Sequence, residues 1–185
     1  TNGVTAFTAY NFCHNLNTSA TTDTLDLSVS NSLTANRTIN ALKLNNVAGL
    51  TAGGSAGTTL TIGAGALLNS VGNNTLSTPI VNFGTTAYIQ VAGGTTLTVD
   101  STLTGGTGLA KSLPGTLQFD TRSFITSTHN LLNGTVKLVS GGVDTLFTNH
   151  LLNINNGATL DLTGGSHAIG SCPDPGALAG SGGDN

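Results

Sequence analysis

The sequence predicts an all-β protein: a single-stranded right-handed parallel β-helix (β-solenoid) of about eight coils with roughly 20 residues each. Short stretches alternate apolar and polar residues with a period of two, so each strand buries one face and exposes the other. These stretches recur at steps of 16 to 24 residues. A repeat of this length cannot bury its own apolar face and is stable only when it stacks on its neighbours. The apolar pairs are Leu25/Leu27, Leu42/Leu44, Leu60/Ile62, Val81/Phe83, Leu97/Val99, Leu117/Phe119, Val136/Leu138 and Leu160/Leu162.

Four of these apolar residues share one phase of the alternation, which predicts a single inward-facing core ladder: Leu60, Leu97, Leu117 and Leu160. Asn and Gly pairs lie between the strands and can adopt the left-handed backbone conformations that sharp bends require. Parallel strands joined through such bends follow the right-handed crossover rule. The turn pairs include Asn45-Asn46, Asn73-Asn74, Asn155-Asn156, Gly53-Gly54, Gly93-Gly94, Gly105-Gly106, Gly141-Gly142 and Gly164-Gly165.

The composition of the 185 residues fits a single solenoid domain, residues 1–185. A hydrophobic fraction of 37% excludes ordinary disorder, which lacks the apolar residues that drive folding. Five basic residues are scattered along the chain, and all eight acidic residues are Asp. Because phosphate binding needs clustered Lys and Arg, we expect no nucleic-acid partner. No apolar run has the length of a membrane span, so we expect no membrane insertion. Because the chain contains no Met, we expect it to be a segment or a processed unit of a longer repeat protein.

Four segments of the chain have the form of known repeat motifs. Residues 106–119 (GTGLAKSLPGTLQF) and 133–141 (NGTVKLVSG) are similar to GSGGLTKSGAGTLTLSG and the NGGTLQLGG that follows it in the autotransporter-associated β-strand repeat family. Residues 35–44 (ANRTINALKL) and 156–164 (NGATLDLTG) resemble the ANRTVNSLRL and GATLDLNG elements of large secreted repeat proteins. The resemblance covers nearly the whole chain and implies a parallel β-helix that is secreted or lies on the cell surface.

The two cysteines, Cys13 and Cys172, lie near opposite ends of the chain. In a linear solenoid their Cα atoms should be much farther apart than the roughly 7 Å that a disulfide allows, which argues against a bond within one chain. An inter-subunit disulfide between stacked units fits both positions and an oxidising exterior. The alternative is two unrelated buried thiols that pack as small apolar groups.

Patterns for catalysis or metal binding are weak. A polysaccharide-cleaving β-helix needs carboxylates clustered on one face with a base or Ca²⁺. Asp26 and Asp161 share the outward strand position but are several coils apart. Asp120 and Asp144 are the closer pair, but the chain has no Glu and few basic groups to complete an acid/base system. The histidines have no ligand spacing, and solvated turn residues are the simpler interpretation. They are His14, His129, His150 and His167. We therefore expect no catalytic residue, no metal and no cofactor.

Outward Thr residues and Asn sequons raise two further possibilities. Several strands have the T-x-T form of solenoid ice-binding proteins, but others carry Lys43, Gln118 or Lys137 at the equivalent positions. Thr as a good strand residue is therefore the favoured interpretation. The T-x-T pairs are Thr59/Thr61, Thr96/Thr98 and Thr102/Thr104. The candidate glycosylation sites are Asn17, Asn36, Asn73 and Asn133, a number that chance explains in a chain so rich in Asn, Ser and Thr.

Together these features predict a non-catalytic extracellular structural protein that forms a surface stalk, coat or fibre. The sequence shows no convincing cap at either end, with Val4 to Leu16 as a weak candidate at the N-terminal end. Unpaired backbone edges should therefore favour a head-to-tail homopolymer. One alternative is an adhesin or glycan-binding passenger domain, in which Tyr10, Tyr88 or Phe147 would stack on cell-surface glycans. A polysaccharide-cleaving enzyme is the other alternative.

Overall fold

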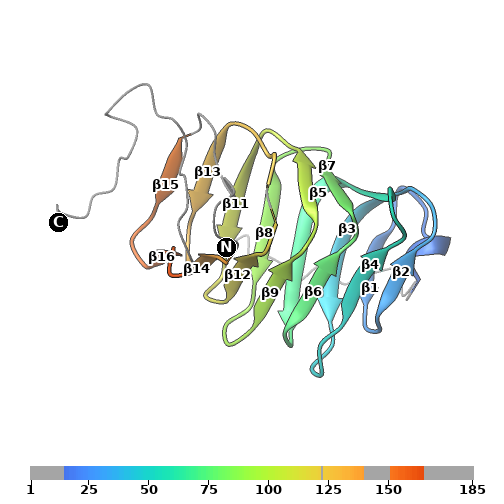
Figure 1. The fold of residues 1–185 in the computed structure, drawn as a ribbon, viewed down its shortest axis with the longest axis horizontal. Helices are drawn as coiled ribbons and strands as arrows, with labels where there is room; N and C mark the ends of the chain where they lie inside the picture. The colour runs from blue at the N-terminus through green and yellow to red at the C-terminus, as the bar shows by residue number, and fades with distance from the viewer. Residues whose placement is uncertain (1–14, 122, 140–150, 165–185) are drawn as a thin grey trace, which may run out of the picture.

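The computed structural model describes residues 15–121, 123–139 and 151–164. Apart from one turn of 3-10 helix, η1 (Leu16–Thr18), the regular elements of these residues are β-strands. All strands that pair do so in parallel. The fold is thus a parallel β-solenoid of about five turns, with strands stacked along the long axis from β1 and β2 to β15 and β16 (Figure 1).

The strands form two sheets, and each turn of the chain alternates between them. Sheet A has nine strands: β1 (Thr24–Leu27), β3 (Arg37–Asn45), β5 (Thr59–Val71), β7 (Ile80–Phe83), β8 (Ala87–Val91), β10 (Thr102–Gly105), β11 (Gly108–Ser112), β13 (Thr128–Leu131) and β15 (Leu152–Ile154). Sheet B has seven: β2 (Asn31–Leu33), β4 (Thr51–Gly54), β6 (Asn74–Ser77), β9 (Thr96–Val99), β12 (Thr116–Phe119), β14 (Gly134–Leu138) and β16 (Ala158–Asp161).

Sheet A is divided into two sides, which makes the cross-section of the solenoid three-sided. The first half of the long strand β5 pairs with β7, and β7 pairs with β10; we call this side A1. The second half of β5 pairs with β8, which continues through β11 and β13 to β15; this is side A2. It also contains β1 and the second half of β3, whereas the first half of β3 belongs to side A1. Sheet B closes the third side.

The core is one continuous cluster of aliphatic side chains inside the three sides, with Phe83 and Phe119 as its largest members. Strands such as β8 and β9 alternate buried and exposed or partly exposed residues, as the period-two pattern predicts. Because a coil buries its apolar residues only against the coils above and below, the core depends on the register between strands.

The number of coils differs from the sequence expectation of eight, because the eight apolar pairs do not mark eight turns. Leu25 stacks on Leu42, but Leu42 then stacks on Leu67. The pair Leu60/Ile62 lies on side A1, and Leu97/Val99 lies in sheet B. The series therefore changes side twice. Every side presents an apolar pair of the same appearance, so periodicity alone does not show on which side a pair lies.

The predicted core ladder divides for the same reason. Leu97 pairs with Leu117, which pairs with Val136 and then Leu160, so these three leucines do form one column in sheet B. Leu60 instead stacks on Val81 of side A1, so its placement in that ladder is wrong. Leu60, Leu97 and Leu117 are fully buried, whereas Leu160 is partly buried and packs against the core cluster.

A cap covers the edge of sheet B at the N-terminal end, where the sequence indicated only a weak candidate that ends at Leu16. Leu16 of η1 is fully buried and joins the core. Its amide donates to Asn31 Oδ1 at 3.2 Å, and Asn17 Nδ2 donates to the carbonyl of Ser32 at 2.9 Å. Both acceptors lie on β2, so η1 pairs polar groups of an edge that a solenoid end otherwise exposes.

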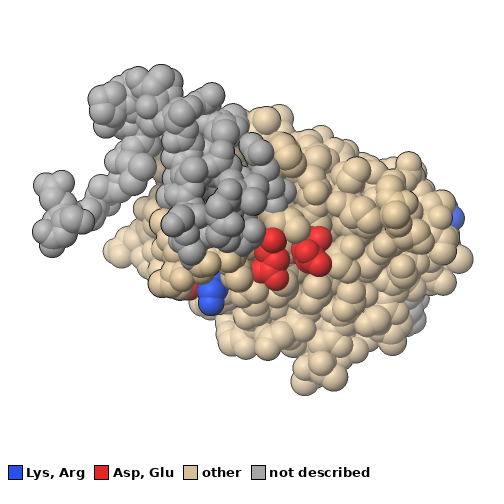
Figure 2. All heavy atoms as spheres, in the orientation of Figure 1, with Lys and Arg blue, Asp and Glu red and all other residues tan. Residues whose placement is uncertain are grey.

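Charge is sparse over the surface. Figure 2 shows only a few basic and acidic residues among uncharged ones on the coloured part of one face. Among the residues that the structure describes, no helix is long and apolar enough to cross a membrane.

The stacked column of sheet B leads to a stability prediction. Replacing Leu117 with Ala should lower the free energy of unfolding by about 2–5 kcal/mol, because it leaves a cavity between two neighbouring coils. Leu132→Ala is the matched control, since Leu132 is 42% exposed and its truncation should cost much less. Urea denaturation of the two variants measures the difference. Equal losses of unfolding free energy in the two variants would show that Leu117 in the stacked column stabilises the fold no more than the exposed Leu132 does.

Candidate functional site

Many of the residues singled out from the sequence lie outside the described residues. They are Cys13 and Cys172, the histidines His14, His150 and His167, Asp144, and the aromatic residues Tyr10 and Phe147. His129 is described and is not a solvated turn residue: it is buried on β13, facing the interior between Leu109 and Leu152. Its Nδ1 lies 3.1 Å from the carbonyl oxygen of Ser127.

The four candidate glycosylation sites lie at or near corners of the solenoid, and three of them join neighbouring coils. In each of the three, the side-chain oxygen accepts a hydrogen bond from a backbone amide of the next coil. The bonds run from Thr34 N to Asn17 Oδ1 (2.8 Å), from Thr59 N to Asn36 Oδ1 (2.9 Å) and from Thr96 N to Asn73 Oδ1 (2.9 Å). Asn133 is exposed, and its carbonyl oxygen accepts a bond from Lys111. The side chains of Asn17, Asn36 and Asn73 therefore satisfy backbone amides near the ends of strands.

Two further asparagines form a buried network at the corner between side A2 and sheet B. Asn74 Oδ1 accepts from the amide of Leu50 at 2.8 Å, and its Nδ2 donates to Asn69 Oδ1 and to the carbonyl of Val71. Asn69 Nδ2 donates in turn to Thr95 Oγ1 at 2.9 Å. Both asparagines are almost fully buried. Such a network is stable in an apolar core only because its polar atoms are paired.

Lys111 occupies an interior position on side A2, between Ile89 and Leu131 of the neighbouring strands. It is completely buried. Its Nζ donates to three backbone carbonyls, of Leu113 at 2.6 Å, Asn133 at 2.9 Å and Ser112 at 3.1 Å. Burial lowers the pKa of Lys111 to about 8, because desolvation disfavours the charged ammonium.

The carbonyl cage around Lys111 fixes an unusual turn. Leu113 has a φ of 65°, a conformation that side-chain-bearing residues rarely adopt, and its carbonyl receives the shortest of the three bonds. Gly134, with a φ of 76°, passes so close that a Cβ atom there would lie 2.7 Å from Nζ. Sequence reasoning missed this lysine by treating it as a scattered surface charge. Its place two residues after Leu109 in the alternating pattern was a signal that it faces inward.

The structure does not bring together Asp26 and Asp161, the two carboxylates that share the outward strand position in the sequence pattern. Asp26 lies on β1 of sheet A, whereas Asp161 lies on β16 of sheet B. Hydrogen bonds from the hydroxyl and amide of Thr163 lower the pKa of Asp161. Within residues 15–121, 123–139 and 151–164, no group of three His, Cys or Asp side chains is arranged to hold a metal ion.

Threonines form an outward column on sheet B, with Thr96, Thr116, Thr135 and Thr159 in register on four successive strands. The adjacent outward column continues from Thr98 through Gln118 and Lys137 to Asp161. This second column carries charged and amide side chains, so the side lacks the paired Thr rows that a flat ice-binding surface requires. The column fits the role of Thr as a good strand residue.

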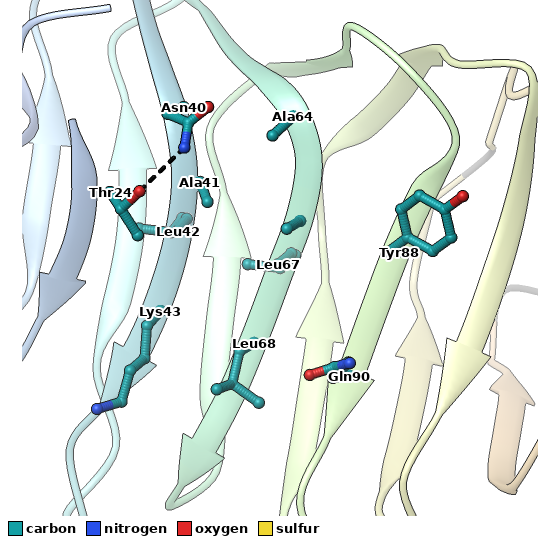
Figure 3. Close-up of a pocket in the computed structure, with 11 residues that line it drawn as sticks. Thr24, Asn40, Ala41, Leu42, Lys43, Ala64, Leu67, Leu68, Tyr88 and Gln90 are labelled. Carbon is teal, nitrogen blue, oxygen red and sulfur yellow. Dashed lines mark hydrogen bonds between the residues drawn. The ribbon is translucent and has the colours of Figure 1, made fainter. Parts of the chain in front are cut away.

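A hollow of about 290 Å³ lies on the outer face of side A2. Its floor is formed by Ala41 of β3 and Ala66 of β5, which are paired in register. Tyr88 of β8 pairs with Ala66 and stands beside this floor with 51% of its surface exposed. Figure 3 shows the Tyr88 ring on one side of the hollow and Thr24 and Asn40 on the other.

The rim of the hollow is polar but has little net charge. Asn40 Nδ2 donates to Thr24 Oγ1 at 3.0 Å, which orients both side chains, and the exposed amide of Gln90 lies near Tyr88 (Figure 3). Lys43 Nζ contacts Asp26 Oδ2 at 2.8 Å. Because this ion pair neutralises the lysine, the hollow presents amide and hydroxyl groups around an apolar centre.

A local irregularity of β5 produces the hollow. Between Ile39 and Ala41 the partner strand advances from Ile62 to Ala66, so β5 contains two extra residues at this bend. Gly65 has a φ of 72°, and a side chain there would collide with the carbonyl of Thr86 on the next coil. The Gly-Ala-Gly-Ala run of residues 63–66 therefore gives both the bend and the shallow floor.

Comparison of the chain with protein-family models, with curated proteins and with solved structures gives no match. The motif resemblance to autotransporter-associated repeats is therefore not supported by these comparisons, and the site is interpreted from its own geometry.

The buried asparagine network predicts a specific stability loss. Asn74→Ala should lower the free energy of unfolding by about 1–3 kcal/mol, because the buried amide of Leu50 loses its acceptor. Asn156→Ala, at an exposed turn position, serves as control and should change stability by less than about 0.5 kcal/mol. Thermal and urea denaturation compare the two. A neutral effect at Asn74 would contradict the assignment.

The buried lysine predicts a pH dependence of stability. Lys111 has a pKa of about 8 in the folded protein, against about 10.4 in an unfolded chain, so it loses its proton at a lower pH when the protein is folded. Between these pH values the unfolded state binds more protons, so this group makes stability rise with pH. Melting temperatures from pH 7 to 10.5, measured against Lys111→Met, isolate the effect. The same pH slope in both proteins would exclude it.

Proposed function

We propose that this chain is a non-catalytic extracellular structural protein whose β-solenoid units stack end to end into a surface stalk, coat or fibre. The observation that supports this best is the pair of parallel sheets that share one continuous core from η1 to β16. In such a rod the main-chain hydrogen bonds between coils run along the axis, so a pull along the rod is shared by many bonds.

The side chains at the corners support the same mechanical role. Asn17, Asn36 and Asn73 each add a bond between neighbouring coils, and Lys111 holds a turn to the coil that carries Asn133. The surface has few charges, so salt should affect the fold little. The scattered basic residues likewise favour partners other than nucleic acid.

The ends of the rod suggest how units would join. Among the described residues, β15 and β16 each pair with a single strand, and so does β1. Since η1 covers the edge of β2, we place the joining N-terminal edge on β1 of side A2. Stacking β15 of one unit on β1 of the next continues side A2. This contact is heterologous and does not close, so it propagates as a homopolymer. We also propose that the coils wind in a right-handed sense, because connections between parallel strands follow that rule.

An edge proline tests the assembly. Asn155 N donates to the carbonyl of Leu131, and Leu151 O accepts from His129, so the alternating ladder directs the amide of Ile154 away from β13. Ile154→Pro removes this donor at the outer edge while leaving the internal bonds in place. We expect the parent protein to form filaments in electron micrographs and Ile154→Pro to shorten or abolish them.

The control is Ile154→Val, which keeps the edge amide and should assemble like the parent. Light scattering and native mass measurements follow the same variants in solution. A parent chain that stays monomeric at high concentration, or filaments that persist in Ile154→Pro, would contradict end-to-end stacking through β15.

A further inference from the structure

We infer that the hollow on side A2 is a binding site for a neutral oligosaccharide, with Tyr88 as its stacking platform. The first argument is the aromatic ring itself. Tyr88 lies on a regular strand, so its backbone is held by β5 on one side and β11 on the other. Half of its surface is nevertheless exposed, which leaves the aromatic ring available to a ligand. The CH-rich face of a pyranose ring stacks well on such a surface.

The shape of the hollow supports a flat, narrow ligand. Its alanine floor spans β3 and β5, and at a strand spacing of about 4.8 Å it is roughly two strands wide. Leu68 and Lys43 lie toward one end of it, whereas the small Ala64 lies at the other (Figure 3). The volume of about 290 Å³ is near the lower limit of small-molecule sites, which fits a few sugar rings better than a protein segment.

The polar groups define the charge of the ligand. Asn40, Thr24 and Gln90 offer amide and hydroxyl groups at the rim, the types that bond to sugar hydroxyls. The lysine of the rim is held by Asp26 at 2.8 Å. An acidic sugar would have to compete with Asp26 for Lys43, while a neutral one would not. Charge complementarity therefore favours a neutral glycan over a uronate or a sulfated chain.

The chain offers a direct optical test of this site. It contains no Trp and two Tyr residues, so Tyr10→Phe leaves Tyr88 as the sole tyrosine fluorophore. In this background we would titrate cellotetraose, xylotetraose, mannotetraose and chitotetraose as neutral probes, with tetragalacturonate as the acidic one. We expect at least one neutral probe to change the tyrosine emission in a saturable manner, and tetragalacturonate to bind at least tenfold more weakly.

Three variants then locate the binding by calorimetry with the best neutral probe. Tyr88→Ala and Ala66→Leu should each weaken binding at least tenfold, the first by removing the platform and the second by filling the floor. Tyr88→Phe, which retains the ring, should bind within about threefold of the parent. Phe124→Ala is the matched control: Phe124 is an exposed aromatic outside the hollow, and its loss should leave binding unchanged. Thermal melting checks that each variant is folded.

Several outcomes would overturn the inference. These are no binding of any neutral probe, stronger binding of tetragalacturonate, or undiminished binding in folded Tyr88→Ala. Sedimentation of the parent and Tyr88→Ala tests another occupant: if the substitution changes self-association and not glycan binding, the hollow is a contact between copies of this chain. Filament formation is measured separately, so loss of glycan binding and loss of assembly are distinguished.

Discussion

The structure depends on one constraint: no single coil of this chain can bury its own apolar residues. Each strand has too few residues for a core, and only the parallel stacking of coils in register places Leu97, Leu117, Val136 and Leu160 in contact. The same stacking pairs the backbone amides and carbonyls between coils. Apolar burial and backbone pairing therefore rise or fall together, which is typical of proteins built from nearest-neighbour repeats.

The corners are where this arrangement is most demanding, because the chain leaves the strand geometry and its backbone groups lose their partners. At these corners, side chains instead of further strands provide the hydrogen-bond partners of the backbone groups. Asparagines at the surface bridge the outer corners, and Asn69 and Asn74 pair with each other inside. Lys111 donates to two carbonyls of the turn at Leu113 and to the carbonyl of Asn133 on the neighbouring coil. Burying an ammonium without a carboxylate is costly, but here its bonds to backbone oxygens join two coils.

The hollow beside Tyr88 is a consequence of the same geometry. Two extra residues in β5 bend the strand at Gly65, and the small residues needed for that bend leave a gap in the otherwise regular outer face of side A2. A structural requirement of the coil thus accounts for the hollow that we propose as a glycan-binding site.

The sequence by itself determined the period-two strands, their parallel stacking as a solenoid and the burial of residues such as Leu60 and Leu117, because alternation and repeat length are local properties. It did not determine the side on which each pair lies, since that depends on how many residues each bend consumes. For this reason Leu60 was assigned to the wrong ladder. The cap at Leu16, the cage around Lys111 and the alanine floor beneath Tyr88 each join residues from different coils. Only the tertiary structure decided them, because the register between coils is set by the packing of the whole core.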